Sequence, residues 1–273
     1  GQTLNITSSG NLTAGSYNIL ADKAVIAGNL TSGSGIFNIT TGEGMYISST
    51  GKVIAGTGDD YLGSLIMMSG EYSATSATTH ITSNNSEGYS VKHNGTLTAN
   101  SGKFRIESQD TTYLDLAGSS GNLYDLEIAT SDTANEATAV VPFDIDNDLT
   151  IVSGTFHNGP FENNVAGNFL KTGGRLKYAS SNDWLDVAGN LISTGGDLDD
   201  DSAGFSARTY VSGNVSITGL TMNMDNSWLY IKGNLNTTIN ASESQVGGYF
   251  YINKGTGYEV KALSNLTFHH LIH

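Results

Sequence analysis

The densest group of ionisable side chains is an acidic run in the C-terminal half of the chain. Its four aspartates are Asp197, Asp199, Asp200 and Asp201. Hard cations such as Ca²⁺ are bound by several carboxylate and carbonyl oxygens, so this run is a candidate calcium site. The alternative interpretation is a solvated loop at a variable corner of the fold. Calcium is the only cofactor that the sequence suggests.

Ten asparagines stand in the Asn-x-Ser/Thr pattern that accepts N-linked glycans. They are Asn5, Asn11, Asn29, Asn38, Asn84, Asn94, Asn214, Asn236, Asn240 and Asn265. Glycosylation requires a secreted protein in an organism with that pathway. A chain rich in Asn, Ser and Thr also produces such patterns by chance, and an asparagine that faces inward at a corner would accept no glycan.

Aromatic side chains recur in segments that alternate apolar and polar residues. They are Tyr113, Trp184, Tyr210, Trp228, Tyr230, Tyr249, Phe250 and Tyr251. Successive side chains of a β-strand point to opposite faces, so about half of these rings are expected in the core and the others outside. Exposed Tyr and Trp on one face would suit contact with carbohydrate or protein.

These segments belong to a repeat that opens on Gly, Asn and an apolar residue. In the C-terminal half the steps begin at Gly167, Gly189, Gly213 and Gly233, so their spacing is nearly constant. The N-terminal half carries a weaker version, which begins at Gly10 and continues at Gly28. A period of about 20–50 residues is the sequence signature of a repeat architecture.

The repeat predicts an all-β fold, a single-stranded right-handed parallel β-helix of about a dozen coils of roughly 22 residues. Apolar runs are short and are separated by Gly, Asn, Ser and Asp, and no stretch has helical periodicity. Glycine suits corners that need positive φ. Asparagines aligned at successive corners are expected to hydrogen-bond to the next coil. The preference of parallel crossovers predicts the right hand.

Domain organisation follows from the same repeat. Solenoids grow in one dimension, so residues 1–273 are expected to form a single β-solenoid domain. The chain begins at Gly1, and its last residues 266–271 resemble the opening of another coil. We therefore expect both ends to be truncated or processed.

Composition excludes several classes of function. The net charge is −14 with 12 basic residues and no basic stripe, which argues against a nucleic-acid partner. No run of about 18 apolar residues is present, so direct membrane insertion of this segment is not expected. The chain lacks cysteine, which excludes disulfides and thiolate metal sites. Few charges and many Gly, Ser, Thr and Asn are typical of extracellular, cell-surface β proteins.

The repeat units resemble the repeat regions of large bacterial and archaeal cell-surface proteins with a right-handed parallel β-helix, or pectin-lyase-like, architecture. The closest matches are residues 147–156 and 263–271, within units of the form strand-Gly-Asn-Leu closed by an aromatic strand. The resemblance implies an adhesin, a filament subunit or an envelope component. It is an analogy of fold, which supports architecture more than activity.

Polysaccharide lyases and hydrolases share that architecture. The polygalacturonase group carries Asn-Thr-Asp, Gly-His-Gly and Arg-Ile-Lys, and none of the three occurs here. Lyases resembling pectate lyase use an arginine beside Ca²⁺-binding aspartates, whereas Arg105, Arg175 and Arg208 are each distant in sequence from the acidic clusters. No catalytic or cofactor-binding residue is therefore nominated, although stacking of coils can bring distant residues together.

Three functions follow in order of preference. The first is a non-catalytic extracellular structural or adhesive protein, a stalk or a filament or envelope subunit, with self-association or other surface proteins and glycans as partners. The second is a polysaccharide-active enzyme or tailspike-like depolymerase, and the third is a glycan-binding module on the same fold.

Overall fold

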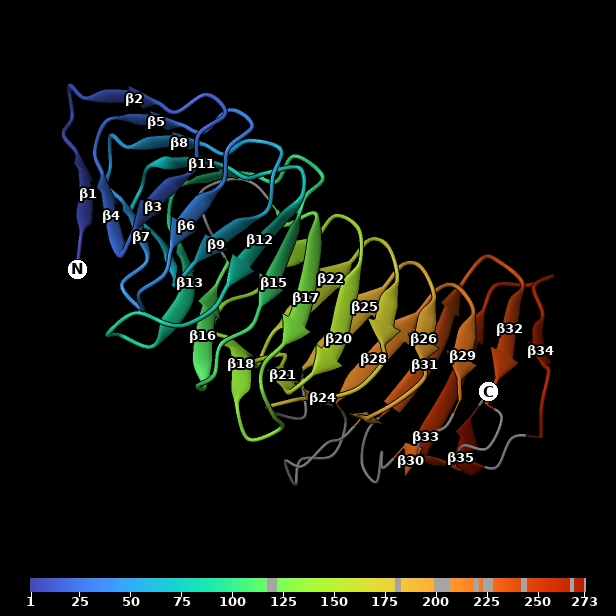
Figure 1. The fold of residues 1–273 in the computed structure, drawn as a ribbon. Coiled ribbons are helices and arrows are strands. Elements are labelled where there is room, and N and C mark those ends of the chain that lie inside the picture. Colours follow the sequence, from blue (N-terminus) through green and yellow to red (C-terminus); the bar gives the residue numbers. More distant parts are fainter. Residues whose placement is uncertain are drawn as a thin grey trace. The chain divides into compact units, whose positions relative to one another are not determined.

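The structure, a computed structural model, describes all residues except 117–121, 180–182, 199–206, 219–220, 223–227, 242–244, 266–267 and 273. Every regular element among the described residues is a β-strand. The parallel strands stack into a β-solenoid of about ten turns of about 22 residues (Figure 1). This confirms the all-β solenoid, with slightly fewer turns than the dozen expected. The right-handed coiling stays a prediction.

The contacts divide the chain into two compact units. Unit 1 comprises Gly1–Ser131 and Asn135–Val141, and unit 2 comprises Asp132–Ala134 and Pro142–His273. If residues 1–273 form a single domain, the two units should unfold together. The single domain stays a prediction. No helix in the described part of the chain is long and apolar enough to cross a membrane.

Unit 1 contains three parallel sheets, and consecutive strands along the chain belong to different sheets. Sheet A consists of β1 (Thr3–Ile6), β4 (Lys23–Ile26), β7 (Met45–Ile47), β10 (Leu65–Met67), β13 (Tyr89–His93), β16 (Thr112–Asp115) and β18 (Glu136–Ala139). Sheet B consists of β2 (Asn11–Thr13), β5 (Asn29–Thr31), β8 (Lys52–Ile54), β11 (Glu71–Ser73) and β14 (Thr96–Thr98). Sheet C consists of β3 (Ile19–Ala21), β6 (Phe37–Ile39), β9 (Asp60–Leu62), β12 (Thr78–Ile81), β15 (Lys103–Ile106) and β17 (Asp125–Ala129).

The strands of unit 2 also fall into three groups, which we name sheets D, E and F within that unit. Sheet D consists of β19 (Asp144–Ile145), β22 (Glu162–Val165), β25 (Trp184–Val187), β28 (Arg208–Val211), β31 (Trp228–Gly233) and β33 (Gln245–Lys254), with β30 (Thr221–Met222) and β35 (Phe268–Ile272) paired to β33. Sheet E consists of β20 (Leu149–Ser153), β23 (Phe169–Lys171), β26 (Leu191–Ser193), β29 (Val215–Ile217), β32 (Thr237–Asn240) and β34 (Val260–Ala262). Sheet F consists of β21 (Thr155–His157), β24 (Arg175–Lys177) and β27 (Asp197–Leu198).

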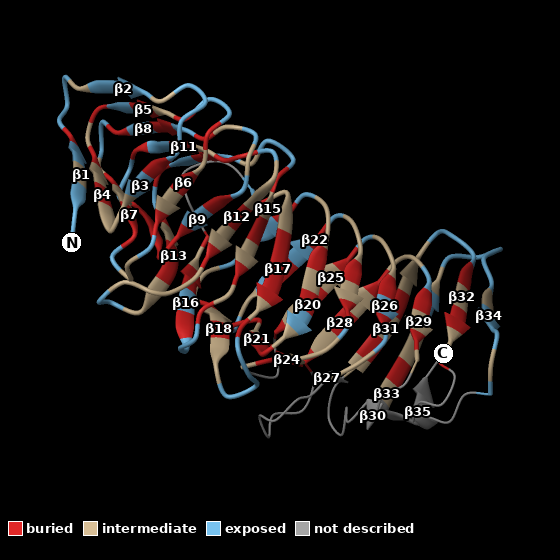
Figure 2. Cartoon of the chain, in the orientation of Figure 1, coloured by how far each residue is buried: buried red, intermediate tan, exposed pale blue. Residues whose placement is uncertain are grey.

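The core of each unit is a set of apolar columns that run from turn to turn. In sheet E the inward side chains of Phe169, Leu191 and Val215 are register partners, and all three are buried. Inward and outward residues alternate along most strands, as the buried and less buried bands of Figure 2 show. This alternation confirms the expectation that the closing aromatic strands are half-buried.

The asparagines of the repeat form the predicted hydrogen-bond column at one corner of unit 2. The backbone N–H of Asn190 donates to Oδ1 of Asn168 at 3.0 Å, and the N–H of Asn214 donates to Oδ1 of Asn190 at 2.8 Å. Asp148 begins the column by accepting from the N–H of Asn168 at 2.6 Å. Each side chain therefore satisfies a backbone donor of the following turn.

The fourth Gly-Asn step, at Gly233, does not continue this column. Asn214 instead accepts from the N–H of Thr238 at 2.8 Å. The strand β31 runs on through Gly233, so the corner comes later than the motif predicts, and Leu235 is 63% exposed.

A column of glycines forms another corner of unit 2. Gly154, Gly174 and Gly196 have φ angles of 73°, 59° and 73°, in the left-handed region that favours glycine. A Cβ on Gly196 would overlap the carbonyl oxygen of Gly174, one turn away. Both the angle and the close approach require glycine here, as the sequence indicates.

Candidate functional site

The acidic run lies largely outside the described residues. Asp197 begins β27, whereas Asp199, Asp200 and Asp201 fall in the segment that the structure does not describe. Elsewhere in the described chain no three His, Cys, Asp or Glu side chains are arranged to hold a metal ion. The calcium site at the four aspartates therefore stays a prediction.

The ten candidate glycosylation sites all lie at least partly at the surface. Seven asparagines are exposed, and Asn38, Asn84 and Asn240 are intermediate in exposure. The possibility that corner asparagines face inward therefore does not apply to these ten positions. Whether any of them carries a glycan stays a prediction.

The outer face of sheet D carries most of the aromatic residues singled out in the sequence. One column of register partners contains Trp184, Arg208, Trp228 and Tyr249. The neighbouring column contains Asp186, Tyr210, Tyr230 and Tyr251. Phe250 is the only one of the eight singled-out aromatic residues that is buried, so the expectation that about half of these rings lie in the core is wrong. We call the six outward rings of these two columns the aromatic ladder.

The rings of the aromatic ladder pack mainly on one another. Trp228 stacks on Tyr249 with centroids 4.4 Å apart and ring planes 13° apart. Tyr230 lies 4.8 Å from Tyr210 and 4.8 Å from Tyr251. Trp184 meets Tyr210 edge to face at 6.2 Å. A sugar stacks on an open face of an aromatic ring, and in the ladder neighbouring rings cover such faces. The ladder is therefore better suited to joining turns than to binding sugars.

An ion pair ties the aromatic ladder together across two turns. Lys232 of β31 bonds to Asp186 of β25, and its Nζ lies 5.1 Å from the ring centroid of Tyr210, which the strand between them carries. Burial disfavours the phenolate and raises the pKa of Tyr230 above its ordinary value. The hydroxyl of Tyr230 therefore remains a neutral donor at physiological pH.

We expect Tyr230→Ala to lower the free energy of unfolding by about 2–3 kcal/mol, because Tyr230 contacts the rings of Tyr210, Trp228 and Tyr251. The control is Tyr258→Ala, which removes a tyrosine that is 42% exposed in the same unit. Denaturant unfolding of both variants measures the difference. Equal losses would show that the ladder adds no specific stability.

A network of ion pairs lies on the outer face of sheet C in unit 1. Arg105 Nε donates to Glu107 at 2.5 Å, and Arg105 Nη1 bonds to Glu127, which also binds Lys103 at 2.6 Å. His80 Nδ1 lies 2.9 Å from Glu107. Each carboxylate is thus held by a cation or an imidazole, which suits a structural network better than an acid that must donate a proton.

This network is not evident in the sequence, because Arg105 and Glu127 are far apart along the chain. Their separation is one turn of the solenoid, and the two residues are register partners on β15 and β17. The repeat length was therefore the signal that could have joined them.

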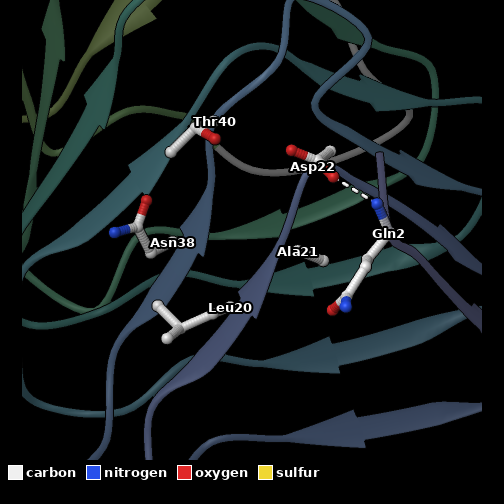
Figure 3. Close-up of a pocket in the computed structure, with 6 residues that line it drawn as sticks. All are labelled: Gln2, Leu20, Ala21, Asp22, Asn38 and Thr40. Atoms are coloured by element: carbon white, nitrogen blue, oxygen red, sulfur yellow. Dashed lines mark hydrogen bonds between the residues drawn. The ribbon is translucent and has the colours of Figure 1, made fainter.

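A shallow pocket of about 260 Å³ lies beside β3 and β6 (Figure 3). Six residues line it: Gln2, Leu20, Ala21, Asp22, Asn38 and Thr40. The carboxylate of Asp22 accepts a hydrogen bond from the backbone N–H of Gln2, as Figure 3 shows. Asp22 is the only carboxylate among these six, whereas most glycoside hydrolases use two that are roughly 5–10 Å apart.

Two further hollows lie on the outer face of sheet B. One, of about 300 Å³, lies over β2, β5 and β8, and the other, of about 190 Å³, lies over β8, β11 and β14. Both are lined by Lys52 and Ile54, so they adjoin at β8. We call the pair the sheet B trough.

The sheet B trough could also have been found in the sequence. Three of its strands read polar-apolar-polar with Thr last, namely β2, β5 and β14. The recurring outward hydroxyls of these strands were therefore a signal in the sequence.

Comparisons of the chain with models of protein families, with curated proteins and with solved structures found no match.

Proposed function

We propose that this chain is a non-catalytic, extracellular structural or adhesive protein of the cell surface, a stalk or a filament or envelope subunit. The resemblance of its repeats to those of bacterial and archaeal surface proteins belongs to the same proposal. Self-association and other surface proteins or glycans are its partners. A tailspike-like depolymerase is the enzyme class that this proposal competes with.

The observation that carries the proposal is the turn-to-turn continuity of the outer surface of unit 2. Backbone ladders, the Asn168–Asn190–Asn214 column and the aromatic ladder all join successive turns. In a repeat protein, stability comes from such contacts between neighbouring turns. A surface whose side chains are occupied with each other supports mechanical continuity better than it supports a reaction.

Electron microscopy and light scattering of the same purified sample test the structural role. Filaments or ordered oligomers are expected for a filament or envelope subunit. A strict monomer without ordered assemblies would exclude those two roles and leave the stalk or adhesive role. A monomer that also degrades polysaccharide would overturn the proposal.

A further inference from the structure

The sheet B trough is hollowed along the direction in which the turns stack. Its floor is formed by two outward columns of register partners on β2, β5, β8, β11 and β14. One column contains Asn11, Asn29, Lys52, Glu71 and Thr96. The other contains Thr13, Thr31, Ile54, Ser73 and Thr98.

These side chains are mostly hydroxyls and amides. Thr and Ser hydroxyls both donate and accept hydrogen bonds, and the Asn amide does the same through separate atoms. They recur at the strand spacing of ~4.8 Å, which is close to the length that one sugar unit adds to an extended glycan. Ile54, which is 38% exposed, adds an apolar surface at the centre, where the apolar face of a sugar ring could pack.

The charges of the trough cancel. Lys52 Nζ lies 2.6 Å from a carboxylate oxygen of Glu71, and these are the only two charged side chains among the residues that line it. The chain as a whole has a net charge of −14, so a polyanion would be repelled. Because the floor of the trough is neutral and the protein as a whole is acidic, the trough favours an uncharged ligand with many hydroxyls.

We propose that the sheet B trough binds an uncharged, linear glycan that lies along the stacking direction of unit 1. The inference rests on the proposed function, to which it adds the class of partner. The hydroxyl and amide columns hold the glycan by hydrogen bonds, and successive turns of the solenoid contact successive sugar units. The trough contains one carboxylate, Glu71, and that carboxylate is paired with Lys52, so the glycan is held without being cleaved.

Isothermal titration calorimetry with defined hexasaccharides tests this site. The probes are neutral hexasaccharides of glucose, mannose, xylose and N-acetylglucosamine, with the hexasaccharide of galacturonic acid as the anionic comparison. We expect at least one neutral probe to bind and the anionic probe not to bind. The double variant Thr31→Val/Thr98→Val keeps the shape and removes two hydroxyls, and it should weaken binding at least tenfold.

The matched control is Thr138→Val, which removes an outward hydroxyl from β18 in the same unit but outside the trough. It should bind as the unaltered protein does. No binding of any neutral probe, a preference for the anionic probe, or equal affinity of the double variant and the control would overturn the inference. Circular dichroism of each variant establishes that the fold is intact.

The two proposals fail separately. A neutral glycan that is bound in the trough but shortened during the titration would refute the non-catalytic role and retain the site. Filaments or ordered oligomers that bind no neutral probe would retain the structural role and refute the site.

Discussion

Leu191→Asp is expected to remove most of the stability of unit 2. Leu191 is fully buried between its register partners Phe169 and Val215, so the variant would place an unpaired carboxylate in an apolar column. Loss of a buried leucine alone costs about 2–5 kcal/mol, and burial of an unpaired charge adds to that cost. We expect a loss of at least about 4 kcal/mol, which is comparable to the whole stability of many domains.

The control for this variant is the adjacent substitution Ile192→Asp. Ile192 points outward from the same strand and is 37% exposed, so its carboxylate would remain hydrated. Thermal unfolding followed by circular dichroism should show a large loss for the first variant and little change for the second. Similar behaviour of the two would mean that the inward and outward faces of sheet E are assigned wrongly.

The second large effect concerns Asp60, whose side chain is inside unit 1. Its Oδ1 accepts a hydrogen bond from the N–H of Phe37 at 2.7 Å, while its Oδ2 is buried without a hydrogen-bond partner in the described chain. Burial raises the pKa of Asp60 from 3.8 to about 7, although the bond from Phe37 opposes the shift. Burial also raises the pKa of the neighbouring Tyr72 well above its ordinary value, and the charge of Asp60 adds to that effect.

The stability of unit 1 should therefore decrease as the pH rises from about 4 to about 7. The pKa of Asp60 is higher in the folded state than in the unfolded chain, so the folded state binds the proton more tightly in this window. The stability that this tighter proton binding contributes is fully present below the pKa of Asp60 in the unfolded chain. It is lost as the pH rises through the pKa of Asp60 in the folded state. The difference between the two pKa values corresponds to about 4 kcal/mol.

Asp60→Asn is expected to remove this pH dependence. An amide keeps an oxygen that can accept from the N–H of Phe37 and carries no charge at any pH. The variant should exceed the unaltered protein in stability at pH 8 by a few kcal/mol and approach it at pH 4. Calorimetric melts between these pH values measure the difference.

Asp115→Asn, which alters an outward carboxyl of β16, is the control. It should retain the dependence on pH between 4 and 7. Parallel stability curves for the unaltered protein and Asp60→Asn would show that the side chain of Asp60 is hydrated in the folded state.

The fold could be predicted from the sequence because a local motif marks several of the turns. Gly and Asn at Gly167, Gly189 and Gly213 define corners whose geometry depends on those residue types, and the asparagine column forms as expected. Prediction failed at Gly233, where the strand β31 continues past the motif. A strand end is decided by pairing with neighbouring turns, and the motif alone contains no information about that pairing.

The surfaces were less predictable than the turns. Alternation predicted about half of the eight aromatic rings in the core, but only Phe250 is buried, and alternation could not show that Trp228 and Tyr249 stack on each other. The Arg105–Glu127 pair is separated by 22 residues, the length of the repeat, whereas turns of unequal length bring the columns of the sheet B trough into register. Because the turn length varies, a fixed period applied to the sequence does not align these columns.

Incubation of the protein with soluble polysaccharides, followed by measurement of their chain lengths, tests the central claim most directly. The panel should contain neutral and acidic polymers, with and without added Ca²⁺, and the protein should be present in excess. The account predicts unchanged chain lengths throughout, with neutral polymers retained by the protein. Shortening of any polymer that depends on the folded protein would contradict the proposed non-catalytic, structural or adhesive role.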